Sequence, residues 1–156
     1  MLESELRKPV EDWLVKYGYT VAHECMVGGY CDLIGSKWGK RVGKRRPKLN
    51  EVMAVELKLR DIKGVIEQAK SNHRHVNKSF AAMPLDFCRR MRMSSRDKFD
   101  EAGIGLIGID VKSGEIVVFH CSEEKTDRDY NSGLRTFIKD RLWSFNLRHK
   151  AKEPSK

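Results

Sequence analysis

The sequence lacks long apolar runs and paired-cysteine motifs. Because no stretch approaches the roughly 18 apolar residues that cross a bilayer, we expect no membrane partner. No basic segment followed by an apolar one opens the chain, so we expect a cytoplasmic protein without an export signal. With 156 residues the chain can bury a core of its own, and we expect a single domain over residues 1–150 with a disordered tail at 151–156.

Cysteine is scarce, and its spacing suggests no site. No two of the four cysteines are separated by two residues, and with the neighbouring histidines they fit no standard zinc-binding pattern. We therefore expect reduced and mostly buried thiols. The four residues are Cys25, Cys31, Cys88 and Cys121.

Acidic residues are fewer than basic residues. The chain has 31 Lys and Arg against 22 Asp and Glu, which gives a net charge of +9 and favours an anionic partner. Residues 35–50 contain no acid, and their glycines and proline predict a long basic loop inserted between two strands. Such a loop can follow a phosphate backbone, or it can be a solvated hairpin tip. Its basic residues are Lys37, Lys40, Arg41, Lys44, Arg45, Arg46 and Lys48.

Regularly spaced apolar residues are abundant in the sequence. Apolar residues spaced three and four apart predict helices, and alternation or short apolar runs predict strands. Their order is typical of an α/β fold with a mixed central β-sheet flanked by helices. Pro9 is expected to kink or divide the first helix. Helices are predicted over residues 2–17, 62–76, 85–93 and 95–102 (the last two as one broken helix or two short ones) and 131–148, and strands over 19–25, 30–34, 52–60, 79–83, 104–109 and 116–120.

One face of the strand predicted over residues 52–60 changes from apolar to charged along its length. Its odd-numbered residues are all apolar and belong against a core. The even-numbered face begins small and apolar and ends in Glu56, Lys58 and Arg60. Glu56 and Lys58 lie about 7 Å apart on that face, close enough to contact one bound phosphate or metal ion. This pattern is typical of a sheet that lines a polar cleft.

The strand predicted over residues 30–34 carries Asp32 between apolar neighbours. A buried aspartate is costly unless it is paired or bound to a cation. It can equally cap a turn at the end of the strand, and both interpretations stay open. Neighbouring strands lie about 4.8 Å apart, so Asp32 and Glu56 could share a cation if the register brings them together. Mg²⁺ typically takes one or two protein carboxylates.

One order of residues resembles the motif of the PD-(D/E)xK nuclease superfamily: Asp32, then Glu56-Leu57-Lys58, then Gln68. These residues come after an acidic helix, and they lie within or beyond a hairpin. That superfamily includes Holliday-junction resolvases and many restriction enzymes. The resemblance covers roughly residues 3–110 and implies a restriction-endonuclease-like core with Mg²⁺ or Mn²⁺ as cofactor. It implies that Asp32 and Glu56 are metal ligands, that the Leu57 backbone carbonyl is a third, and that Lys58 is the catalytic lysine.

The resemblance extends to residues outside the two strands. Gln68 matches the helix glutamine that some members carry next to the site. Glu5 best matches the glutamate of the first helix, and Glu3 and Glu11 are alternatives because of the expected kink. Cys31 departs from the pattern, since it stands where the motif has a proline.

The function that the resemblance implies is hydrolysis of DNA phosphodiesters, in duplex or branched DNA, by a metal-dependent endonuclease. Arg60 and the basic loop would contact the DNA backbone. Because many members act as homodimers, a homodimer is one expected assembly. The alternative is a catalytically inactive module that binds DNA or structured RNA through the same basic surface, with Glu56 and Lys58 in structural roles.

Overall fold

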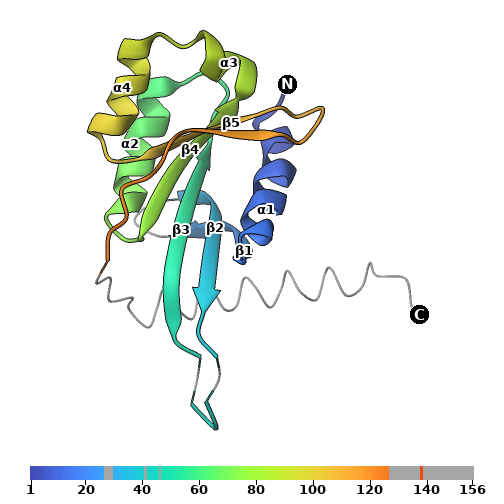
Figure 1. Ribbon diagram of the computed structural model, residues 1–156, viewed down its shortest axis with the longest axis vertical. Coiled ribbons are helices and arrows are strands. Elements are labelled where there is room, and N and C mark those ends of the chain that lie inside the picture. The colour runs from blue at the N-terminus through green and yellow to red at the C-terminus, as the bar shows by residue number, and fades with distance from the viewer. Residues whose placement is uncertain (27–29, 41, 46, 127–137, 139–156) are drawn as a thin grey trace, which may run out of the picture.

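The computed structural model describes residues 1–26, 30–40, 42–45, 47–126 and 138 (Figure 1). Within these ranges the chain forms an α/β fold, as the patterning predicts. Its elements are η1 (Glu3–Leu6), α1 (Arg7–Lys16), β1 (Thr20–Met26), β2 (Tyr30–Trp38), β3 (Leu49–Leu57), α2 (Ile62–His73), β4 (Lys78–Pro84), α3 (Leu85–Arg90), α4 (Met93–Glu101), β5 (Gly105–Ile109) and β6 (Ile116–His120).

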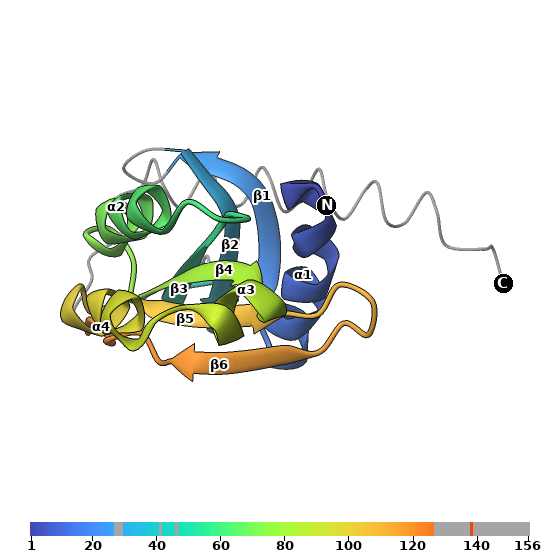
Figure 2. The same ribbon diagram turned by 90° about the horizontal axis from the view of Figure 1, so that it is seen from above.

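A six-stranded mixed sheet runs in the order β1-β2-β3-β4-β5-β6. The first three strands are antiparallel, β3, β4 and β5 are parallel, and β6 is antiparallel to β5. Both parallel connections step the same way across the sheet, so right-handed crossovers place α2, α3 and α4 on one face. The first helix, α1, covers the opposite face (Figures 1 and 2). The predicted mixed sheet flanked by helices is thereby confirmed.

Apolar side chains fill both sides of the central strands. On one face Leu6, Val10 and Leu14, one helical turn apart, pack against β3 residues such as Val55 and Leu57. On the other face α2, α3 and α4 pack against β4 and β5 in a separate buried cluster. Burial on both faces explains the nearly continuous apolar runs of β4 and β5.

The first helix is divided, as Pro9 predicts, but the division precedes the proline. Residues Glu3–Leu6 form a 3₁₀ turn and the α-helix begins at Arg7. Pro9 therefore falls in the first turn of α1, where a backbone N–H has no partner within the helix.

The predicted loop over residues 35–50 is wrong in extent, because β2 and β3 run further and leave only residues 39–48 between them. Gly35, placed in that loop, pairs with Met53 inside the sheet. A Cβ at this position would lie 3.1 Å from the Tyr19 ring and 3.2 Å from Leu14, so a side chain here would force these neighbours to give way by a few tenths of an ångström. Strand β3 also ends sooner than expected, at Leu57 rather than residue 60.

The predicted terminal helix (131–148) and tail (151–156) lie outside the described residues, except for Ile138. Ile138 is fully buried and packs with Ile34, Val52 and Ala54 of the β2–β3 hairpin. None of the helices that the structure describes is long and apolar enough to span a membrane.

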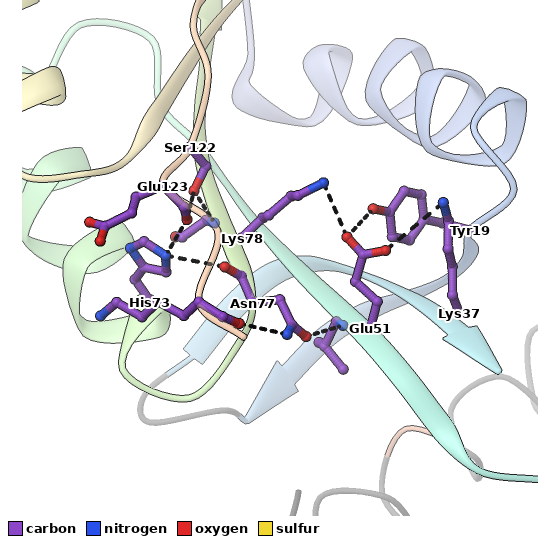
Figure 3. Close-up of polar contacts among 11 residues, drawn as sticks. Tyr19, Lys37, Glu51, His73, Asn77, Lys78, Ser122 and Glu123 are labelled. Carbon is purple, nitrogen blue, oxygen red and sulfur yellow. Dashed lines mark hydrogen bonds and ion pairs between the residues drawn. The ribbon is translucent and has the colours of Figure 1, made fainter. Parts of the chain in front are cut away.

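A hydrogen-bond network fastens the segment after β6 to the turn between α2 and β4 (Figure 3). Asn77 Oδ1 accepts the Val52 N–H at 2.9 Å, and Asn77 Nδ2 donates to the Lys125 carbonyl at 2.7 Å. His73 Nε2 lies 2.8 Å from the Glu123 carbonyl, and because that partner can only accept, Nε2 carries the hydrogen. Burial lowers the pKa of His73 and keeps its ring neutral. The network fixes the C-terminal end of α2 against β3.

We predict that Asn77→Ala destabilises the fold by about 2–5 kcal/mol, because it leaves a buried N–H and a carbonyl without partners. Urea unfolding of both proteins measures the change. Asn50→Ala, at an exposed position of β3, is the matched control and should stay within about 0.5 kcal/mol of wild type. Equal losses in the two variants would contradict this role for Asn77.

Candidate functional site

The register of β2 against β3 brings two carboxyl groups together. Leu33 pairs with Val55 and Ile34 with Ala54. Continued by one residue, the same antiparallel register places Asp32 opposite Glu56, with about 4.5–5.5 Å between their Cα atoms. The condition under which the two residues could share a cation is therefore met.

Both carboxyl groups are held in place by hydrogen bonds. Glu56 is only 3% exposed, and its Oε1 accepts from Asn72 Nδ2 at 2.9 Å. Asp32 is partly exposed, and its Oδ2 accepts the Leu57 N–H at 2.8 Å. Access from solvent to the pair is therefore on the side of Asp32.

The electrostatics of the pair favour a proton on Glu56. Burial is the main cause that raises the pKa of Glu56 to about 8, and hydrogen bonding with the Asp32 carboxyl adds to it. The amide of Asn72 and the positive charge of Lys58 act in the opposite direction. Two carboxylates cannot both ionise this close together in a buried place without a compensating charge. The site therefore holds either a proton or a cation.

Strand β1 is distorted next to Asp32. The β1–β2 ladder pairs the residues on either side of Glu24 but skips Glu24 itself. Glu24 has a φ of 54°, in the left-handed region, which costs a non-glycine residue roughly 1–2 kcal/mol. Its carboxylate lies 3.6 Å from Arg7 Nη2 on α1. Backbone strain of this kind is concentrated at functional sites.

Lys58 lies beside the carboxyl pair in sequence but does not contact it. Its Nζ is 3.7 Å from Glu3 Oε1, with the two side chains 28% and 47% exposed, so the pair contributes little to stability. Lys58 and Arg60 line a cleft of about 930 Å³ at the C-terminal ends of β3, β4 and β5. This edge of an α/β sheet is a common place for ligands. Asp32 and Glu56 do not line this cleft.

Of the three glutamates in the first helical segment, Glu3 is the one near Lys58. Glu5, which best matched the family pattern, instead accepts the Leu2 N–H at 2.6 Å and caps the first turn. The 3₁₀ turn has three residues per turn, which changes the direction of Glu5 from that in an α-helix. Glu11 lies 3.2 Å from His23 Nε2, against β1. The structure therefore does not bring Glu5 to the site.

On α2 the residue that reaches the site is Asn72, which the sequence reasoning missed. Gln68, the expected residue, lies one turn earlier and is exposed. Asn72 is 2% exposed and follows Val65 and Ala69 on the apolar side of the helix, at spacings of seven and three. A polar residue within an apolar stripe was the signal that could have identified it.

The basic loop lies at the other end of the hairpin from the carboxyl pair (Figure 1). Glu56 lies seven residue steps beyond Leu49 along β3, so the loop begins about 23 Å away. Lys40, Lys44, Arg45 and Lys48 are exposed there, and Arg41 and Arg46 lie outside the described residues.

Lys37, expected in the basic loop, belongs to strand β2 and makes internal contacts (Figure 3). Its Nζ lies 3.9 Å from Glu51 Oε2 and 4.4 Å from the centre of the Tyr19 ring. Glu51 also accepts from Tyr19 Oη at 2.8 Å and pairs with Lys78 at 3.2 Å. Lys37 thus helps to neutralise Glu51, so less of the Lys37 charge is available to a nucleic-acid partner.

The described residues contain no group of three or more His, Cys, Asp or Glu side chains that could hold a metal ion. A cation at the site would rely on the two carboxyl groups, which suits Mg²⁺ or Mn²⁺ better than zinc. Three of the cysteines, Cys25, Cys31 and Cys88, are buried, and Cys121 is exposed.

The raised pKa of Glu56 predicts a pH-dependent stability in EDTA. A glutamate in the unfolded chain titrates near 4.5 and Glu56 in the folded chain near 8, so between these values the folded state holds more protons. Stability should therefore fall as pH rises from about 5 to 8, by at most about 1.4 kcal/mol per pH unit.

Thermal unfolding across that pH range measures the effect. Glu56→Gln stays neutral and should flatten the dependence, whereas Glu101→Gln, at an exposed position of α4, should keep the wild-type slope. A wild-type slope in Glu56→Gln would show that another group is responsible.

Comparisons with protein-family models, curated protein sequences and solved structures found no match for this chain.

Proposed function

We propose that this protein is a Mg²⁺- or Mn²⁺-dependent endonuclease of the PD-(D/E)xK type that hydrolyses phosphodiester bonds in DNA. The observation that carries the proposal is the placement of Asp32 opposite Glu56 on adjacent strands, with Lys58 two residues further on. When both acids of such a pair are ionised, each carboxylate opposes the other. A divalent cation would resolve that conflict.

The arrangement of elements also supports the proposal. A helix, a three-stranded antiparallel segment, a helix and a parallel strand follow one another in the chain. This order agrees with the restriction-endonuclease-like core that the resemblance implies, with the acidic residues on its second and third strands.

The side chains can be assigned roles on this basis. Asp32 and Glu56 would hold the ion, with the Leu57 carbonyl as a third ligand. When bound, the ion supplies charge neutralisation and a more acidic water. Asn72 fixes the orientation of Glu56 through its hydrogen bond and is a positioning residue. Lys58, only weakly paired with Glu3, would swing to the scissile phosphate and stabilise its growing negative charge.

The competing proposal is a catalytically inactive module that binds DNA or structured RNA. Two observations favour it: Lys58 contacts Glu3 rather than the acids, and most of the exposed basic loop lies far from them. In that case Glu56 keeps its proton, and the acid pair is a hydrogen-bonded strut between β2, β3 and α2. The two proposals differ in metal binding and in cleavage.

We predict that Mn²⁺ raises the melting temperature and that Asp32→Asn or Glu56→Gln abolishes the rise. A ligand at 100 times its dissociation constant stabilises a protein by about 2.7 kcal/mol, which is easily measured by thermal unfolding. Asp97→Asn, at an exposed position of α4, removes a carboxylate away from the pair and should keep the rise. Equal shifts in all four proteins would place the metal elsewhere.

We predict that Lys58→Ala spares metal and DNA binding but lowers cleavage about 100-fold or more, since its role belongs to the reaction step. The assay uses labelled single-stranded, duplex, flap and four-way-junction DNA with Mg²⁺, Mn²⁺ or EDTA. Lys63→Ala, an exposed lysine of α2, is the control. Cleavage that persists in Lys58→Ala would mean another site. Binding without cleavage of any substrate by wild type would favour the inactive module.

A further inference from the structure

A second pocket, of about 520 Å³, opens beside the cleft of Lys58. It is lined by three arginines, together with Phe87 and other uncharged residues. Arg60 lies between β3 and α2, Arg90 is the last residue of α3, and Arg92 directly precedes α4. The lining of this pocket, as far as the described residues form it, contains no acidic side chain. We call it the arginine pocket.

The arginines of this pocket are not neutralised by the protein. None of the three forms an ion pair with the residues that the structure describes. Arg60 and Arg92 are exposed, and Arg90 uses only its Nε, which donates to the Asp86 carbonyl at 3.3 Å. Three guanidinium groups around one pocket repel one another, so an anion that joins them is favoured.

Arg96, an arginine in the same segment, has a structural role. Arg96 Nη2 donates to the carbonyls of Cys88 at 2.9 Å and Arg89 at 3.2 Å. Its guanidinium also lies 4.9 Å from the centre of the Phe119 ring. Arg96 therefore closes the end of α3, whereas the arginines of the pocket present their charge outwards.

The arginine pocket is continuous with the cleft that holds Lys58. Arg60, Phe87 and Arg90 line both hollows. Lys58 and Arg60 are two residues apart, at most about 7 Å along the chain. Figure 2 looks down on this end of the molecule, where α3 lies between α4 and α1. One strand of nucleic acid can therefore pass from Lys58 over Arg60 to the arginine pocket.

We propose that the arginine pocket binds a backbone phosphate of the DNA strand whose cleavage is proposed above, a few nucleotides from the scissile phosphate. The planar guanidinium fork matches phosphate oxygens in pairs, and three forks fix the strand in register with Lys58. The inference rests on the proposed function for its substrate. It assigns Arg90 and Arg92 to DNA binding.

The test measures DNA affinity in EDTA, at several salt concentrations, for wild type, Arg90→Ala and Arg92→Ala. Each variant should bind about tenfold more weakly and lower the slope of log affinity against log salt by nearly one, because one phosphate contact is lost. Arg92→Lys should retain most of the slope, since it keeps the charge. Arg74→Ala, an exposed arginine at the opposite end of α2, is the matched control and should bind like wild type.

The outcomes separate this inference from the proposed nuclease activity, because binding in EDTA needs neither metal nor cleavage. Wild-type affinity and slope in Arg90→Ala and Arg92→Ala, with unchanged melting temperatures, would overturn the arginine pocket even if cleavage is intact. Weakened binding in both variants would support it even if wild type cuts no substrate. A wild-type protein that binds no DNA would overturn both.

Discussion

The register between β2 and β3 is the constraint on which the site depends. Because side chains alternate faces, a slip of one residue would turn Glu56 away from Asp32 and expose the apolar partners of both. Several contacts hold the register: Gly35 lets the Tyr19 ring pack closely, and Asn77 ties the Val52 N–H to the turn after α2. The acid pair is thus positioned by packing and hydrogen bonds well outside it.

Strand β3 contributes residues both to the apolar core and to the candidate functional site. From Val52 to Val55 both faces of the strand are buried among apolar side chains, and the next residue is an acid that is equally buried. Leaving that acid ionised and unpaired would cost several kcal/mol. Asn72 and Asp32 satisfy its hydrogen bonds, but they do not supply positive charge. The fold therefore tolerates Glu56 in the protonated form, and under the proposed function a cation would replace that proton.

Much of this architecture follows from patterns within short stretches of sequence. The alternation around Glu56 and the apolar neighbours of Asp32 predict two strands with acids on them, and Asp61 predicts the start of α2, where its carboxylate accepts the Gly64 N–H. Local patterns do not reveal why a glycine is present. In the sequence Gly35 begins a stretch predicted as loop, whereas its pairing with Met53 and its close approach to the Tyr19 ring place it within strand β2.

Contacts between distant elements were the other part that the sequence did not reveal. Asn72 meets Glu56 across 16 residues of chain, and the pairing depends on how α2 packs on β3. Glu3 replaces Glu5 beside Lys58 because the chain enters α1 through a 3₁₀ turn, a difference in helical pitch that residue spacing does not encode. Both cases involve the relative rotation of two elements, which side-chain packing decides.

Two groups of exposed basic residues stand at opposite ends of the β2–β3 hairpin. Exposed Lys44 and Arg45 stand at the loop, and Arg60 with the arginine pocket stands at the far end, beyond Glu56. The distance of about 23 Å from the loop to Glu56 corresponds to about seven steps of a DNA strand. Under the proposed function, a long duplex could contact both basic regions while a short strand could reach only one. Charge placement would then select substrates by length and shape, since phosphate contacts carry no base sequence.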